Sequence, residues 1–146
     1  MELSKLRLIL GCCWCIGQMW GIHSHNINLQ ADQSQCVTPE KTDGSEEQWD
    51  ISAPDDTYLR LNCIIRGSGS CDQSSILISQ GNRSTTICPT GSQSRHFREN
   101  RNYNTAQITI LNGIPEVTAF CQATAVSTDG QVQIQSASQD PDQCAA

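Results

Sequence analysis

The residues best suited to chemistry in this sequence are its nine cysteines, which form two groups. Cys12, Cys13 and Cys15 lie in an apolar N-terminal stretch. The other six are spread along the rest of the chain: Cys36, Cys63, Cys71, Cys88, Cys121 and Cys144. An even number of cysteines predicts disulfides in an exported domain, although the sequence alone leaves the pairing open. A structural zinc site is disfavoured, because no CxxC pair follows residue 24.

Other reactive residues do not combine into a recognisable catalytic set. Serines are frequent, but no GxSxG segment occurs, and His96 is the one histidine away from the N-terminal region. A hydrolase would need a nucleophile, a base and an orienting acid, so we expect no enzyme activity and no cofactor. His96 lies in the basic stretch 95–101, which we interpret as a solvated loop rather than as a site for an acidic partner.

Two further motifs concern metal binding and modification. A mature chain that begins at Gly21 would place His23 third, with His25 nearby, and such an N-terminus can bind copper. We do not favour copper binding, because it depends entirely on the cleavage site. Asn82, with Arg83 and Ser84, forms a glycosylation sequon in a predicted turn between strands.

The N-terminus is expected to direct export. Lys5 and Arg7 precede an uncharged, mostly apolar stretch from Leu8 to Trp20, which is too short for a membrane span. We therefore predict a signal peptide over residues 1–24, cleaved after Gly21 or Ser24. An uncleaved anchor is disfavoured, and no second apolar run follows. The sequence thus predicts a secreted, extracellular protein without a transmembrane anchor.

The expected mature chain, residues 25–146, has the size of one domain. Without Glu2, Lys5 and Arg7 it holds 14 acidic and 7 basic residues, a net charge near −7, which argues against nucleic acid as a partner. Its few aromatic residues are Trp49, Tyr58, Phe97, Tyr103 and Phe120. We expect disulfides to supplement this small apolar inventory, and the polar residues 136–146 to form a loosely held tail anchored by Cys144.

Apolar residues recur with a period of two, which predicts an all-β fold. The expected strands cover 58–65, 76–78, 85–88, 107–111, 116–126 and, more weakly, 131–135. Asn112-Gly113 is expected to join 107–111 and 116–126 as a hairpin. Residues 25–35 look polar and irregular. No window has a convincing helical stripe, so an antiparallel β-sandwich is the economical architecture.

The cysteine order and its surroundings resemble a CUB domain. Cys36, Cys63, Cys71 and Cys88 are separated by a long, a short and a medium gap. The segment 49–54 before 58–63 is similar to an early CUB strand, a proline turn and a core strand, and 76–79 is similar to the strand after the third cysteine. Residues 120–126 resemble the last strand of CUB domains in arthropod secreted proteins, notably insect venoms and insect trypsin-like proteases.

This resemblance implies a jelly-roll type sandwich with disulfides Cys36–Cys63 and Cys71–Cys88, which leaves Cys121 with Cys144. Many CUB domains bind calcium, for which Glu46 or Glu47 would supply the first carboxylate. Ser74 stands where a second aspartate is expected, with Asp72 displaced, and residues 112–116 lack the later one. Since calcium needs several convergent oxygen ligands, we expect no calcium site and hence no metal.

Two functions remain open at this point. The first is a stand-alone secreted CUB-like module that binds an extracellular protein or a glycan, in a venom or another secretion. The second is an N-terminal regulatory domain, or a truncated product, of a secreted trypsin-like protease. An internal bridge between Cys144 and Cys121 would favour the first, and a tail cysteine free to reach a partner domain would favour the second. Binding residues are not identifiable from the sequence, although loops 66–74 and 93–104 are the candidate regions.

Overall fold

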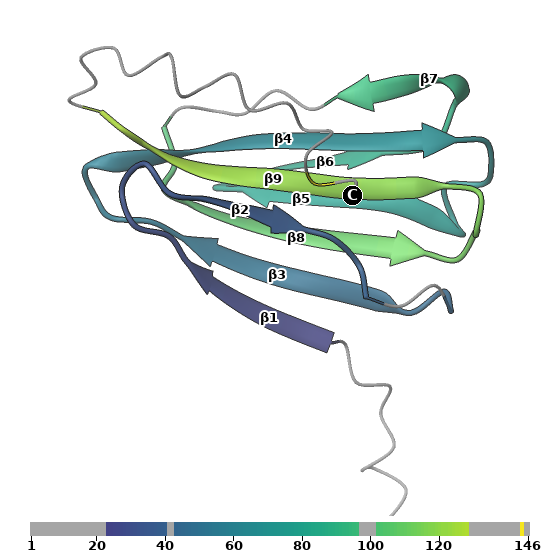
Figure 1. Ribbon diagram of the computed structural model, residues 1–146, viewed down its shortest axis with the longest axis horizontal. Helices are drawn as coiled ribbons and strands as arrows, with labels where there is room; N and C mark the ends of the chain where they lie inside the picture. Colours follow the sequence, from purple (N-terminus) through teal and green to yellow (C-terminus); the bar gives the residue numbers. More distant parts are fainter. Residues whose placement is uncertain (1–22, 41–42, 97–101, 129–143, 145–146) are drawn as a thin grey trace, which may run out of the picture.

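The computed structural model describes residues 23–40, 43–96, 102–128 and 144 (Figure 1). The described residues form nine strands: β1 His23–Asn28, β2 Ser34–Val37, β3 Glu46–Ser52, β4 Thr57–Gly67, β5 Ser74–Gln80, β6 Arg83–Ile87, β7 Gly91–His96, β8 Thr105–Asn112 and β9 Thr118–Ser127. The predicted all-β class is therefore confirmed. Within this part of the chain no helix has the length and apolar character needed to cross a membrane.

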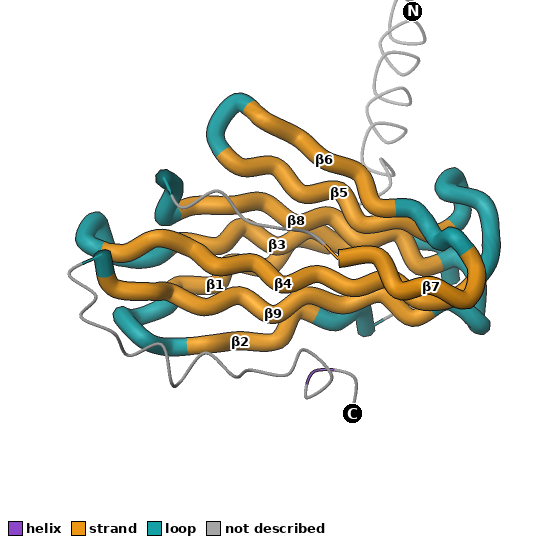
Figure 2. The backbone as a smooth tube through the Cα atoms, turned by 90° about the horizontal axis from the view of Figure 1, so that it is seen from above, coloured by secondary structure: helices purple, strands orange, loops and turns teal. Residues whose placement is uncertain are grey.

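The strands form a two-layered sandwich (Figure 2). One sheet has five strands in the order β1-β3-β8-β5-β6, and the other has four in the order β2-β9-β4-β7. Neighbours run antiparallel except for β1, which lies parallel to β3 at one edge. The predicted antiparallel sandwich is confirmed, and β4 and β9, which pair from Thr57↔Ser127 to Arg66↔Thr118, form the centre of the four-stranded sheet.

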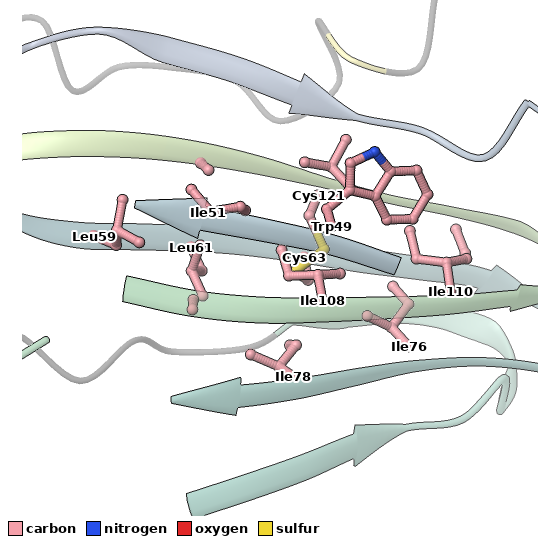
Figure 3. Packing of buried hydrophobic residues seen from close by; sticks show 14 of the residues in the cluster. Trp49, Ile51, Leu59, Leu61, Cys63, Ile76, Ile78, Ile108, Ile110 and Cys121 are labelled. Atoms are coloured by element: carbon pink, nitrogen blue, oxygen red, sulfur yellow. A yellow bond between two sulfur atoms is a disulfide. The ribbon is translucent and has the colours of Figure 1, made fainter. Parts of the chain in front are cut away.

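The core consists of the inward residues of both sheets (Figure 3). Side chains alternate along a strand, so β8 buries Ile108 and Ile110 while Gln107 and Thr109 face outward. Trp49 and Ile51 on β3 and Leu59 and Leu61 on β4 complete the packed layer. This alternation explains why the strands at β4, β5 and β8 were predictable from the sequence.

The predicted hairpin at Asn112-Gly113 is wrong. β8 belongs to the five-stranded sheet and β9 to the four-stranded sheet, so the chain crosses from one layer to the other here. Gly113 N–H donates to the Gln73 carbonyl at 2.8 Å, and Gly44 N–H donates to the Asn112 carbonyl at 3.2 Å. The turn is thus anchored to two other loops, whereas an Asn-Gly pair reports only that the chain bends.

Three strands were not expected from the sequence. β1 overlaps the region 25–35 that was judged irregular, because its outward positions Ser24, Asn26 and Asn28 are polar and Ile27 is its one buried residue. β2 is short and lies at a sheet edge. β7 begins at Gly91, two residues after Pro89. The weaker strand expected at 131–135 lies outside the described residues.

Two of the three disulfides implied by the resemblance are wrong, and Cys71–Cys88 is formed as expected. Cys63 pairs with Cys121, because these residues face each other on β4 and β9 with Cα atoms 4.0 Å apart. Cys36 lies on β2, and β9 separates β2 from β4. A gap of two strand spacings, about 9.5 Å, is too wide for the expected Cys36–Cys63 bridge.

Cys36 pairs instead with Cys144 of the tail, with Cα atoms 5.4 Å apart. Since Cys121 is bonded to Cys63, the expected Cys121–Cys144 bridge is not formed. Cys144 is buried beside Ile64 and Phe120, which face each other on β4 and β9 and point away from the main core. The tail is therefore anchored through Cys144, as predicted, but against the outer face of the four-stranded sheet.

Candidate binding groove

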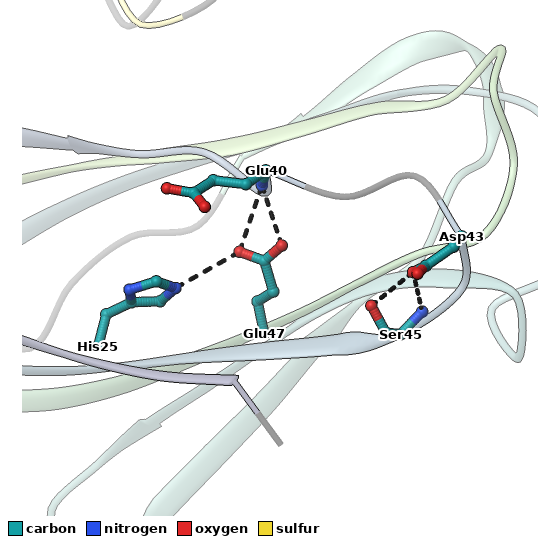
Figure 4. Close-up of polar contacts among 5 residues, drawn as sticks. All are labelled: His25, Glu40, Asp43, Ser45 and Glu47. Carbon is teal, nitrogen blue, oxygen red and sulfur yellow. Dashed lines mark hydrogen bonds and ion pairs between the residues drawn. The ribbon is translucent and has the colours of Figure 1, made fainter. Parts of the chain in front are cut away.

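Two places in the structure gather polar side chains, and the first surrounds Glu47 (Figure 4). Glu47 lies on the inner face of β3, with 2% of its surface exposed. Its carboxylate accepts the Glu40 N–H at 3.0 and 3.2 Å. The Nε2 atom of His25 lies 3.6 Å from the same carboxylate, and the His25 ring stacks on Trp49 with ring centroids 5.3 Å apart.

This arrangement assigns Glu47 a structural role. Glu40 lies in the loop that leads from β2, in one sheet, to β3, in the other. A buried carboxylate is costly unless it is hydrogen-bonded, and here its partner is the backbone of that loop. The stack of His25 on Trp49 meanwhile holds the edge strand β1 against β3. The cluster therefore fixes the inter-sheet loop and the first strand.

The residues at the expected calcium position do not fit that ion. Glu46 is exposed, and both oxygens of Glu47 accept the Glu40 N–H. Ser74 is fully buried, and its hydroxyl accepts the Ile114 N–H at 3.1 Å. Asp72 is exposed on the neighbouring turn. Among the described residues, no group of three or more His, Cys, Asp or Glu side chains is arranged to hold a metal.

The second place is an open groove of about 630 Å³ on the outer face of the five-stranded sheet. It crosses four neighbouring strands, β1, β3, β8 and β5. Its lining consists of Asn26, Asn28, Asp50, Ile51, Ser52, Ser79, Gly81, Thr105, Ala106 and Gln107. Most of these residues carry an amide or a hydroxyl group, and Asp50 is the one ionisable residue among those the structure describes in the lining.

Strand register arranges the polar side chains in two rows. Asn26, Asp50, Gln107 and Ser79 lie opposite one another across β1, β3, β8 and β5. Gln107 Nε2 donates to Asp50 Oδ1 at 2.9 Å within this row.

The second row is formed by Asn28, Ser52 and Thr105. Ser52 Oγ donates to Asn28 Oδ1 at 2.6 Å. Because alternate residues of each strand face the core, the positions between these polar residues are occupied by Ile27, Ile51 and Ala106. The same alternation that builds the core therefore builds the groove.

Tyr103 borders the groove at Gly81. A Cβ atom placed on Gly81 would lie 2.3 Å from Cζ of Tyr103, so the tyrosine ring packs directly on this glycine. Gly81 also has a φ of +61°, which only glycine adopts without cost. The carbonyl of Tyr103 accepts the Leu59 N–H at 2.8 Å, and this bond fixes the backbone that carries the ring. The groove thus has an aromatic side chain at one end of its polar rows.

The sequence-based candidates do not coincide with this groove. Loop 66–74 lies at the end of the sandwich where β4 ends and β5 begins, and residues 102–104 lie at the opposite end, before β8. Of the described residues in the second region, 93–96 belong to β7, which pairs with β4 as far as Gly67, so 102–104 alone lie away from loop 66–74. Residues 97–101 of the basic stretch around His96 lie outside the described residues. His23 begins β1, and Asn82 is exposed in the turn between β5 and β6.

Sequence reasoning missed every polar residue of the groove, although a signal existed. Asn26 and Asn28 flank Ile27, and Asp50 and Ser52 flank Ile51, so polar residues recur with the strand period. That pattern predicts an outward polar face. Which faces become neighbours depends on the strand order, and the strand order comes only from the structure.

No known family profile matches the chain. It is 33% identical over 123 residues to Triatox from Triatoma infestans, an alignment that covers 82% of this chain and 90% of Triatox. It is 25% identical over 128 residues to the venom CUB domain-containing protein 1 from Platymeris rhadamanthus, with 87% and 96% of the two chains covered.

Among solved structures, the CUB1-EGF-CUB2 domains of rat MASP-1 match with a TM-score of 0.44 and 14% identity, over 80% of this chain and 47% of that one. The similarity to Triatox extends over nearly the whole of that protein. Together with the disulfide-linked antiparallel sandwich, it shows that the chain belongs to the insect CUB domain family of these two relatives.

Proposed function

We propose that this protein is a secreted, non-catalytic CUB domain protein that binds a glycan through the outer groove of its five-stranded sheet. Export is supported by the predicted signal peptide over residues 1–24 and by three disulfides, which form in oxidising compartments. One relative is named as a venom protein, so release in a venom or a similar secretion belongs to the proposal.

The observation that carries the proposal is the chemistry of the groove lining. Its volume, about 630 Å³, falls within the range of small-ligand sites, but such sites are usually lined by apolar and aromatic side chains. Here amides and hydroxyls dominate, and each can both donate and accept hydrogen bonds. A ligand that matches this lining is rich in neutral hydroxyl groups, as a glycan is. Tyr103, packed on Gly81, offers a ring face at the margin for an apolar sugar face.

Charge and composition argue against other ligands. The described lining contains no Lys or Arg, and it includes the carboxylate of Asp50, so a phosphate-rich or sulfated partner would be repelled. The described lining offers an extended peptide few apolar pockets, because its apolar side chains, Ile51 and Ala106, are both buried. A neutral glycan carries no negative charge to be repelled by Asp50, and it needs no apolar pockets.

The lining also supports a non-catalytic role. General acid–base catalysis needs two positioned groups whose proton affinities differ, and nucleophilic catalysis needs an activated nucleophile. Among the described lining residues Asp50 is the one ionisable group, and Gln107 already donates to it. The internal Cys36–Cys144 bridge supports a module that is complete in its disulfides rather than one that joins a protease domain through its tail cysteine.

A glycan array tests the proposal. The secreted protein, fluorescently labelled, is expected to bind neutral oligosaccharides, and Gln107→Ala should weaken this binding about tenfold, since one hydrogen bond and its partner are lost. Thr109→Ala is the matched control, because Thr109 lies on the same strand two residues along, outside the groove lining. It should bind as the wild type does.

Three results would contradict the proposal. They are absence of binding to any neutral glycan, equal weakening by both variants, and recovery of a protein ligand whose binding the Gln107 variant abolishes. Thermal unfolding followed by circular dichroism verifies that both variants are folded.

A further inference from the structure

Strand β6 is an unusually exposed edge of the five-stranded sheet. It pairs with β5 on one side, and no strand among the described residues pairs with its other side. Arg83, Ser84, Thr85 and Thr86 are all exposed, so both faces of the strand are open, and only Ile87 is buried. In Figure 2 the β5–β6 hairpin extends away from the strands of the four-stranded sheet.

Such an edge promotes self-association. Its unpaired N–H and C=O groups can pair with an edge strand of another molecule, and folded proteins usually prevent this with charges, prolines, bulges or a cover. β6 carries one charged residue, Arg83 at its first position, followed by the uncharged run Ser84, Thr85 and Thr86. β-Branched residues such as Thr85 and Thr86 favour extended pairing. The strand therefore needs additional protection.

The sequon lies where it could provide that protection. Asn82 occupies the second position of the two-residue turn between β5 and β6, because Gln80 pairs with Arg83. Its side chain is exposed, and Gly81 before it has the positive φ that this tight turn needs. Ser84, the third residue of the sequon, is exposed near the start of β6. A bulky substituent at Asn82 would therefore stand directly beside the open edge.

We propose that Asn82 carries an N-linked glycan, and that this glycan shields the edge of β6 and keeps the protein monomeric. The proposal rests on the proposed export, because the glycan donor is encountered in the secretory pathway. In the reaction, Asn82 Nδ2 attacks the anomeric carbon of a lipid-linked oligosaccharide pyrophosphate. A C–N bond forms, the C–O bond to pyrophosphate breaks, the amide loses one proton, and the lipid pyrophosphate leaves.

The first experiment tests occupancy. The full chain is expressed in insect cells, and the medium and the cell pellet are analysed separately by intact mass. We expect secreted protein with a heterogeneous hexose-containing mass that collapses after peptide-N-glycosidase treatment, with Asn82 converted to Asp. Asn82→Gln and Ser84→Ala should both lack the added mass, and the matched control Ser84→Thr should retain it. A secreted wild-type chain without added mass overturns the site, whereas a chain absent from the medium overturns the proposed export.

The second experiment tests shielding. Size-exclusion chromatography with light scattering is run over a concentration series on the wild type, Asn82→Gln and Ser84→Thr. We expect the unglycosylated variant to self-associate at a concentration at least about tenfold lower than the other two. Thr85→Lys in the Asn82→Gln background should restore the monomer, since a charge on β6 blocks edge pairing. If Asn82→Gln stays monomeric, or if Thr85→Lys does not reverse its association, the shielding role is wrong.

Discussion

Removing the Cys63–Cys121 disulfide should destabilise the domain more than removing the Cys71–Cys88 disulfide. Both bridges cross-link the chain, but Cys63 and Cys121 are 58 residues apart, while Cys71 and Cys88 are 17 apart. The chain-entropy relation gives about 4 kcal/mol for the longer loop and about 3 kcal/mol for the shorter one. Cys63 and Cys121 are also completely buried, so alanines there leave a void that costs about 1 kcal/mol more.

The assay is guanidinium unfolding of Cys63→Ala/Cys121→Ala and Cys71→Ala/Cys88→Ala. Trp49 serves as the fluorescent probe, because it is the one tryptophan after the predicted signal peptide and is 5% exposed. We expect losses of about 5 and about 3 kcal/mol in the free energy of unfolding. A loss smaller for the buried pair than for Cys71–Cys88 would refute the assignment of the longer loop as the main covalent constraint.

Peptide mapping checks the pairing itself without any variant. Digestion of non-reduced protein with trypsin and an Asp-specific protease separates all six cysteines, because Asp129 and Asp142 lie between Cys121 and Cys144. The peptide 61–66 should be linked to the peptide that contains Cys121. A link between 61–66 and the peptide that contains Cys36 would instead support the pairing implied by the family resemblance and contradict the strand order described above.

Three further predictions follow from the packing. Glu47→Ala should lower the free energy of unfolding by about 2 kcal/mol, since it removes the buried carboxylate that accepts the part-buried Glu40 N–H. Glu47→Gln should cost less because it keeps one acceptor; urea unfolding measures both, and equal losses would contradict the role given to the charge. Gly81→Ala should lower the free energy of unfolding by about 2 kcal/mol or more, because alanine is strained at a φ of +61° and its Cβ would collide with Tyr103. The midpoint of thermal unfolding measures this, and an unchanged midpoint would show that the turn is not as described. His25→Ala should shift the Trp49 emission to longer wavelength, because it uncovers one face of the indole ring, and an unshifted spectrum would contradict the stack.

The sequence predicted the strands whose two faces differ most clearly in polarity. β4 alternates apolar and polar residues from Leu59 to Cys63, and β8 does so from Ala106 to Ile110, and a half-buried strand needs that pattern. β1 was missed because Ile27 is its one fully buried side chain and most of its other residues are polar. An edge strand with one solvent-exposed face buries too little apolar surface to be recognised from its hydrophobic pattern alone.

Pairing between distant residues was less predictable, for a topological reason. Asn112-Gly113 correctly marked a turn, yet the chain after it joins the other sheet. The same limit applies to the disulfides, since the position of β9 between β2 and β4 decides that Cys63 meets Cys121. Local sequence patterns determine which face of a strand is buried, whereas strand order depends on contacts between residues far apart in the chain.

The groove, too, could be found only once the strand order was known. Asn28 and Thr105 are far apart in sequence and carry no recognisable motif, but Ser52 pairs with both of them in the five-stranded sheet. Neutral polar residues on a strand are ordinary when taken singly. They form a candidate site only because four strands align them into rows beside Tyr103, and this alignment could not be derived from composition or spacing.

The most direct test of glycan binding is a nuclear magnetic resonance titration of the isotope-labelled protein with neutral oligosaccharides of mannose and of N-acetylglucosamine. We expect concentration-dependent shifts confined to the two polar rows and the margin, namely the side-chain amides of Asn26, Asn28 and Gln107, the backbone of Gly81, and the ring of Tyr103. Saturating shifts concentrated in loop 66–74, or no shifts with any oligosaccharide, would contradict the assignment of the outer face of the five-stranded sheet as the binding surface.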